Sequence, residues 1–399
     1  MQTIPGKSIP HAIELAVTVL SEALMAATNV LLAWFLVRIF GATGFAEYLT
    51  IASLVGVFSI PSLGIQNAFA IGSAAHSLRS HPNVDEKRTV RPITYSVGIL
   101  TCWIIFIPLA IGPLRASANL MFWALPIVVS TISISMCSGF LQGSGAILYW
   151  KTLLSATSLL QLPIIFAVIR FNLTISQFLF LLSIPGLTFA LIVVISHKNF
   201  STVFKGVRIS ISGSMWPIQF AASSSLLLLL NRMLFGDDAA ELVVIMYIFN
   251  SISNVAVSLG SSSFSRIFQN KLVGRKTVFI QALVGLLPLG FGISLLIQQS
   301  RFQVVLPSLE SFRYPPLGDV FALTTNSIVW AILGTILYSR LNLIKRQLVW
   351  YGLGFLVLEL IVFRYAPIQG LAAIWVHAAT GICQLFATVK YLMHKPLFA

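Results

Sequence analysis

Two arginines occupy matching positions near the ends of apolar segments that lie far apart in the sequence. Residues 36–41 read LVRIFG and residues 230–236 read LNRMLFG, so each segment closes with an arginine followed by a glycine. A guanidinium stays protonated when it is desolvated, and it binds phosphate or pyrophosphate oxygens through two parallel hydrogen bonds. Arg38 and Arg232 are therefore the first candidates for binding an anionic ligand. The alternative is that both side chains extend to the outer lipid headgroups.

Two glutamates, Glu22 and Glu359, lie deep inside apolar segments. Charged groups at such positions are costly, and a carboxyl group there can carry a proton or a cation, so both are candidate coupling-ion sites. Glu22 precedes Arg38 by sixteen residues, about 24 Å along a helix, so these two side chains cannot pair directly. The alternative is that each carboxyl group is a protonated or hydrogen-bonded packing residue.

Side-chain amides form a third group of candidates. Those that could hydrogen-bond sugars across a wet cleft are Gln66, Asn67, Asn250 and Asn254, with Gln219 and Asn326 in addition. The alternative is bonding between helices, worth about 0.6 kcal/mol per bond on average in membranes. The pair Gly139 and Gly143 indicates close helix packing. His377 is interpreted as a packing residue in preference to a proton relay.

The composition says which elements must position these groups. Of 399 residues, 57% are hydrophobic and 9% are charged, whereas soluble domains carry about 25% charged residues. The mean hydropathy is +0.92, which places the chain in a bilayer. We predict an all-α, polytopic membrane protein with about twelve transmembrane helices, at 12–37, 48–75, 93–112, 119–141, 152–169, 175–196, 214–234, 242–264, 277–297, 320–339, 347–363 and 368–389.

The charge distribution predicts the orientation of these spans. If the N-terminus is cytoplasmic, seven arginines fall at outer ends or loops: Arg38, Arg115, Arg170, Arg232, Arg301, Arg313 and Arg364. The other 18 of the 25 Lys and Arg residues, every lysine among them, then lie on the inner side, with Lys151 assigned to the connection between the fourth and fifth spans. Such a bias predicts that both termini are cytoplasmic. The net charge of +14 is thereby explained by topology, and we expect the lipid bilayer as a partner and no nucleic acid.

The chain divides into two halves of six spans each. We predict an N-terminal lobe over residues 1–197, a basic cytoplasmic linker over 198–209 and a C-terminal lobe over 210–399, with the lobes around a central cleft. An even number of spans per half gives parallel repeats. The three cysteines lie in apolar runs without metal-binding spacing, and no phosphate-binding loop or hydrolase motif is present. We therefore expect no metal, no cofactor and no enzymatic activity.

Several segments resemble a known family. Residues 36–48 (LVRIFGATGFAEY), the end of the second span at 61–68 (PSLGIQNA) and the exit of the fourth span at 139–145 (GFLQGSG) are similar to polysaccharide-biosynthesis flippases of the multidrug/oligosaccharidyl-lipid/polysaccharide exporter superfamily. So is the hairpin that runs from residue 231 to Tyr247 and Asn250. The chain lacks the thirteenth and fourteenth spans that lipid II flippases have.

This resemblance implies a function. The substrate would be an undecaprenyl-pyrophosphate-linked oligosaccharide, flipped from the cytoplasmic to the periplasmic leaflet of the bacterial inner membrane by alternating access. A glycan polymerase and other assembly proteins would be partners. Two rivals stay open: a cation-coupled drug or metabolite exporter of the same superfamily, and a membrane-embedded glycan polymerase or acyltransferase. The last would use the connection at 298–319, with Arg301, Glu310, Arg313 and Asp319.

Overall fold

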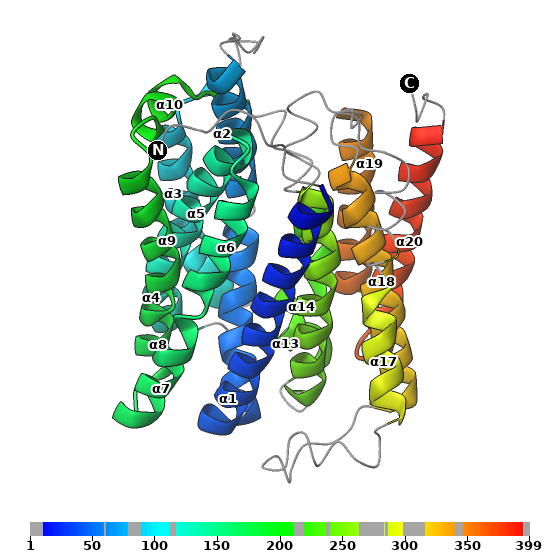
Figure 1. The fold of residues 1–399 in the computed structure, drawn as a ribbon. Helices are drawn as coiled ribbons and strands as arrows, with labels where there is room; N and C mark the ends of the chain where they lie inside the picture. The colour runs from blue at the N-terminus through cyan, green and yellow to red at the C-terminus, as the bar shows by residue number, and fades with distance from the viewer. Residues whose placement is uncertain are drawn as a thin grey trace.

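The computed structural model describes residues 11–59, 61–78, 89–111, 117–210, 219–236, 240–262, 283, 286–297, 316–339 and 346–393. Within these ranges nearly every element is a helix (Figure 1). In the first half the elements are α1 (His11–Ser59), α2 (Pro61–Leu78), β1 (Thr89–Val90), α3 (Pro92–Ile111), α4 (Ala118–Trp123), α5 (Leu125–Gly143), α6 (Ile147–Ser158), α7 (Gln161–Phe171), α8 (Ile175–Leu181), α9 (Ser183–Ser196), α10 (Phe200–Gly206) and β2 (Ile209–Ser210). In the second half they are α12 (Leu226–Leu229), α13 (Asn231–Phe235), α14 (Ala240–Ser262), α17 (Leu287–Ile297), α18 (Leu317–Ser339), α19 (Arg346–Tyr365) and α20 (Leu371–Met393).

The lengths and apolar composition of these helices confirm an all-α polytopic membrane protein. Seven described helical segments are long and apolar enough to cross a bilayer, and a bent pair, Thr43–Val57 with Pro61–His76, would make an eighth. Each of the twelve predicted runs overlaps at least one described helix. The element α1 contains two helices that meet at Gly41, where the backbone is not helical. The predicted runs 12–37 and 48–75 correspond to the segment Ala16–Gly41 and to the bent pair Thr43–Val57 with Pro61–His76.

Three spans of the first half are broken close to a proline. The break between α4 and α5 precedes Pro126, that between α6 and α7 precedes Pro163, and that between α8 and α9 precedes Pro185. Proline has no N–H to donate and its ring clashes with the carbonyl one turn earlier, so the helix ladder is interrupted there. Membranes tolerate this because neighbouring helices satisfy the freed groups.

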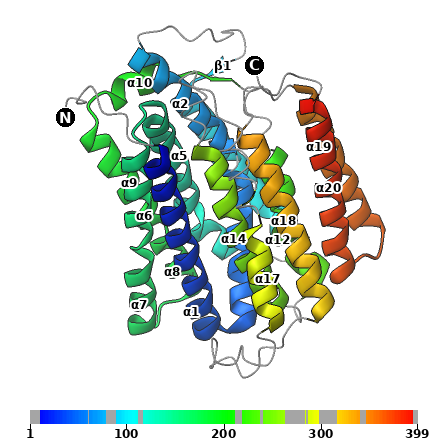
Figure 2. The same cartoon turned by 45° about the vertical axis from the view of Figure 1, so that its right-hand side comes forward.

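Two helices hold the halves of the molecule together. Helices α1 and α14 run side by side in both views (Figures 1 and 2). They separate α6–α9 of the first half from α17–α20 of the second half (Figure 1). Phe45 of α1 meets Tyr247 of α14 edge to face, with ring centroids 6.1 Å apart. The Thr50 hydroxyl lies 3.2 Å from Asn231 Oδ1, to which it can donate a hydrogen bond. The largest hydrophobic cluster spans the first half and extends to residues of α14, while two other clusters lie in the second half.

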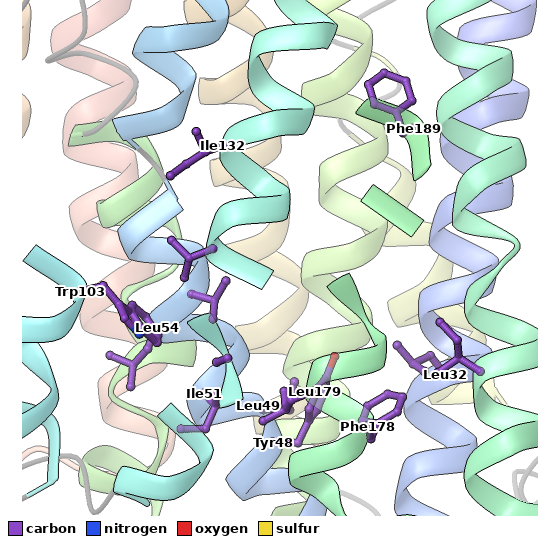
Figure 3. Close-up of a cluster of buried hydrophobic side chains, with 14 of the residues drawn as sticks. Leu32, Tyr48, Leu49, Ile51, Leu54, Trp103, Ile132, Phe178, Leu179 and Phe189 are labelled. Atoms are coloured by element: carbon purple, nitrogen blue, oxygen red, sulfur yellow. The ribbon is translucent and has the colours of Figure 1, made fainter. Parts of the chain in front are cut away.

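The core of the first half is filled by aromatic and aliphatic side chains from many helices. Trp103 of α3 and Leu54 of α1 lie together, and Phe178 and Leu179 of α8 meet Tyr48 and Leu49 of α1 (Figure 3). The indole N–H of Trp103 donates to the Met121 carbonyl at 3.3 Å. This packing fixes the helices of the first half against one another.

The segment after the sixth span is folded onto the first half. Helix α10 and strand β2 pack against α2, with the Phe200 ring stacked on Phe69 at 5.9 Å. Strand β2 pairs antiparallel with β1, so that Val90 faces Ile209. Most of the predicted linker over 198–209 is therefore ordered structure of the first half.

Candidate functional site

The two arginine–glycine segments share a backbone device. Gly41 has φ 72° and ψ 172°, and Gly236 has φ 71° and ψ −177°. This region is essentially restricted to glycine, so both segments require that residue for the same turn. The shared conformation supports the predicted relation between the two halves. The sequence spacing, three residues in one segment and four in the other, did not show it.

The arginines before these glycines differ in their surroundings. Arg38 is exposed, and its guanidinium carbon lies 5.8 Å from the centre of the Trp34 ring. Arg232 is half-buried on α13. Aromatic faces attract cations, so Arg38 is held beside its own helix in this conformation. The joint binding of an anion by both arginines stays a prediction.

Glu22 is buried and pairs with a lysine. Its Oε1 accepts a hydrogen bond from Lys151 Nζ, and the two side chains are 7% and 2% exposed. Lys151 belongs to the interior of the fifth span, on α6, and its placement in an inner connection was wrong. The span begins near Ile147, five residues earlier than predicted. A lysine inside a span is by default a residue with a partner to find, and the later boundary hid that signal.

Glu359 forms the second buried pair, with His377. Their Oε1 and Nδ1 atoms are 2.6 Å apart, and both side chains are fully buried. The His377 ring stacks on Trp330, with centroids 4.8 Å apart and planes at 22°. Gly381 leaves room for this indole, since a Cβ there would lie 3.1 Å from the Trp330 ring. Helices α18, α19 and α20 thus each contribute one ring or charge to this cluster.

The cluster keeps unused hydrogen-bonding capacity. Among the residues that the structure describes, Glu359 Oε2, His377 Nε2 and Trp330 Nε1 have no hydrogen-bond partner. Buried polar atoms are usually bonded, so each such atom calls for an explanation. Beside Trp330 lies a small cavity of about 30 Å³, also lined by Asn250 and Asn326. It has room for a water molecule or a small cation.

The predicted amides divide between packing and cavity. Gln66 donates to Gln142 Oε1 at 3.0 Å across the α2–α5 contact, so it bonds between helices in this conformation. Asn250 lines the cavity beside Trp330, Asn254 is exposed on α14, and Asn67 is half-buried on α2. Of the predicted sugar-binding amides, the structure therefore brings Asn250 and Asn326 to the cavity beside Trp330, and Gln219 to a second, smaller cavity.

A second amide network lies further along the C-terminal helices. Gln219 donates to Gln384 Oε1 at 3.0 Å, and its Nε2 lies 3.2 Å from the Ser223 hydroxyl oxygen. Gly352 lets α19 approach, since a Cβ there would lie 2.2 Å from the Gln219 amide carbon. A cavity of about 10 Å³ adjoins these amides. Within the described part of the chain no three His, Cys, Asp or Glu side chains group as metal ligands.

Comparison with known proteins identifies the fold. No sequence-family profile and no curated protein matches the chain. Among solved structures, it is similar to the eukaryotic MATE transporter AtDTX14, with 12% identity, 96% of this chain and 93% of that chain covered, and a TM-score of 0.60. It is also similar to the MATE multidrug transporter DinF-BH, with 14% identity, 99% and 97% covered, and a TM-score of 0.52. The chain therefore has the fold of the MATE transporters.

Proposed function

We propose that the chain is a secondary transporter of the multidrug/oligosaccharidyl-lipid/polysaccharide exporter superfamily. We further propose that it flips an undecaprenyl-pyrophosphate-linked oligosaccharide across the bacterial inner membrane. The fold supports the first part, since alternating access needs two packed halves that can separate. The sequence likeness of residues 36–48 and 139–145 to polysaccharide flippases supports the second.

The choice of an anionic substrate rests on one observation: the two buried glutamates already have partners within the protein. Glu22 and Glu359 are the buried carboxyl groups of the described chain, and each is paired with a base of its own protein. A cleft for cationic drugs needs bare carboxylates. The hairpin arginines Arg38 and Arg232 are the candidate groups for a charged ligand, because a guanidinium binds pyrophosphate oxygens through two parallel hydrogen bonds.

The decisive experiment follows the lipid-linked oligosaccharide in a bacterial strain that lacks this gene. Leaflet-resolved labelling should find single complete units trapped on the cytoplasmic leaflet. Units that reach the periplasm but fail to lengthen would instead indicate a polymerase, and a normal lipid-linked pool would rule out both. The segment 298–315, on which the polymerase reading mainly rests, lies outside the described residues.

Complementation tests the arginines. Arg38→Ala, Arg232→Ala or the double variant should abolish glycan display while the protein stays in the membrane. Arg364→Ala, an exposed arginine in the last turn of α19, is the matched control and should display normally. Full display by both single variants and the double variant would refute the arginine site.

A cation-coupled drug or metabolite exporter is the second candidate, and the likeness to the fold of a multidrug transporter favours it. We propose that Glu359, together with His377 and the cavity lined by Asn250, carries the coupling proton or cation in either case. One of the similar structures is described as a multidrug transporter. Growth of cells that overproduce this chain, in a panel of cationic drugs, should be unchanged. Resistance that disappears with Glu359→Gln would support the exporter.

A further inference from the structure

The Glu22–Lys151 pair joins two spans inside the first half of the protein. Glu22 lies on α1 and Lys151 on α6, 129 residues apart in the chain. The ammonium nitrogen also lies 4.1 Å from the centre of the Trp150 ring. That ring is itself fixed, because its Nε1 donates to the Ser138 hydroxyl at 2.9 Å. The lysine is therefore held by a carboxylate and by an anchored aromatic ring.

This arrangement fills the position that an ion would need. A buried carboxylate without a counter-charge takes up a proton or binds a cation, because an isolated charge in low dielectric is too costly. Here the chain supplies that charge from its own α6. A proton bound to Glu22 would leave the Lys151 ammonium unpaired, and a sodium ion would meet that ammonium in the same place.

We propose that Lys151 is a built-in counter-cation which occupies the ion position beside Glu22 and closes the first half of the protein to ion coupling. The coupling ion is then left to the Glu359–His377 cluster, and replacement of Lys151 by a neutral residue creates an ion site at Glu22. This inference goes beyond the proposed substrate, since it concerns ion binding in the absence of any substrate.

Helices α5 and α9, which pack against α6 along with α1, offer no described charged group that could replace Lys151. Helix α9 contains no ionisable side chain. The ionisable side chain of α5 is Cys137, whose thiol contacts the Ala190 carbonyl oxygen at 3.8 Å. On α1, Arg38 lies sixteen residues beyond Glu22, too far along the helix to reach it, and Glu47 lies on the helix that follows the turn at Gly41. On α6, Tyr149 faces the His197 ring instead.

The test is the thermal stability of the purified full chain in detergent. Each variant is melted between pH 5.5 and 8.5, in sodium chloride and in choline chloride. Lys151→Met keeps most of the side-chain volume but leaves Glu22 unpaired. It should melt at least about 5 °C below wild type at pH 8.5 in choline chloride, and lower pH or sodium should restore much of that loss.

Two further variants make the outcome decisive. The double variant Glu22→Gln/Lys151→Met should melt near wild type and lack the new ion response, because a buried pair replaced on both sides is often tolerated. Any response of the wild type to pH or sodium should disappear with Glu359→Gln and persist with Glu22→Gln/Lys151→Met. If Lys151→Met does not fold but the double variant does, the unpaired carboxylate is the cause, as proposed.

Three results would overturn the inference. The first is a Lys151→Met variant whose melting temperature does not respond to pH or sodium. The second is a wild-type response to pH or sodium that depends on Glu22 and not on Glu359. The third is that neither Lys151→Met nor the double variant folds. Because no substrate is added, none of these results depends on which lipid or drug is carried.

Discussion

The contact between α2 and α5 gives the sharpest prediction about stability. Gly139 and Gly143 of α5 lie directly on the backbone of α2, so that a Cβ built on Gly143 would stand 2.1 Å from the Ala70 carbonyl oxygen. An ordinary Cβ contact begins near 3.4 Å. In Gly143→Ala the two helices must therefore separate by roughly 1.3 Å, because backbone carbonyls cannot rotate away as a flexible side chain can.

The cost of this separation can be estimated from the contacts that it breaks. Forced overpacking costs about 1–3 kcal/mol. A shift of that size would also stretch the Gln66–Gln142 hydrogen bond, now 3.0 Å, out of range at about 1 kcal/mol. We expect Gly143→Ala to lower the free energy of unfolding by roughly 2–4 kcal/mol.

The assay is reversible unfolding in mixed detergent micelles, with Gly98→Ala as the matched control. Gly98 is an exposed glycine inside α3, and a Cβ there meets nothing within 4 Å. The control should be stabilised by up to about 1 kcal/mol, because alanine is the better helix former. If Gly143→Ala and Gly98→Ala were equally stable, the close approach of α2 and α5 would be refuted.

Three other predictions concern single contacts. Thr50→Val removes a buried hydroxyl that lies 3.2 Å from Asn231 Oδ1 and 2.9 Å from the Ala46 carbonyl oxygen. The loss should cost about 1–3 kcal/mol and broaden the distances between spin labels on the two halves, and an unchanged distribution would count against this link between them. Trp150→Phe removes the donor to Ser138 and should lower the melting temperature about as much as Ser138→Ala. Because both variants break the same hydrogen bond, a double variant whose loss in melting temperature equals the sum of the two single losses would contradict that bond. Phe200→Ala removes a ring stacked on α2 and should speed hydrogen exchange in residues 200–210 at nearly unchanged overall stability; equal protection in variant and wild type would contradict the docking of α10.

The membrane helices and their breaks could be predicted from the sequence because both have local causes. Apolar runs of sufficient length predicted the spans, and the breaks near Pro126, Pro163 and Pro185 follow from the missing proline N–H. The role of Gly139 and Gly143 in close helix packing is likewise confirmed. Each of these features depends on residues that are neighbours in the chain or on one helix face.

The pairings inside the bilayer could not be predicted, because they depend on which spans touch. Glu22 and Lys151 are 129 residues apart, and no local pattern links them. Glu359 and His377 are only 18 residues apart, yet their contact requires α19 and α20 to present these side chains to each other. His377 was interpreted as a packing residue, and its stacking on Trp330 agrees with that. Its contact with Glu359 is what the sequence did not reveal.

The two halves share a backbone device but differ in the chemistry of their buried charges. Gly41 and Gly236 adopt the same conformation, each following an arginine near the end of a helix. Glu22 pairs with the ammonium of Lys151, which also lies over the Trp150 ring, whereas Glu359 pairs with the imidazole of His377, which stacks on Trp330. The pair in the second half keeps two buried atoms, Glu359 Oε2 and His377 Nε2, that have no hydrogen-bond partner among the described residues. If the Glu359–His377 cluster carries the coupling ion, as we propose, the described helix contacts lead from α20 through α18 and α14 to α1, and this is the route by which ion binding would move the first half.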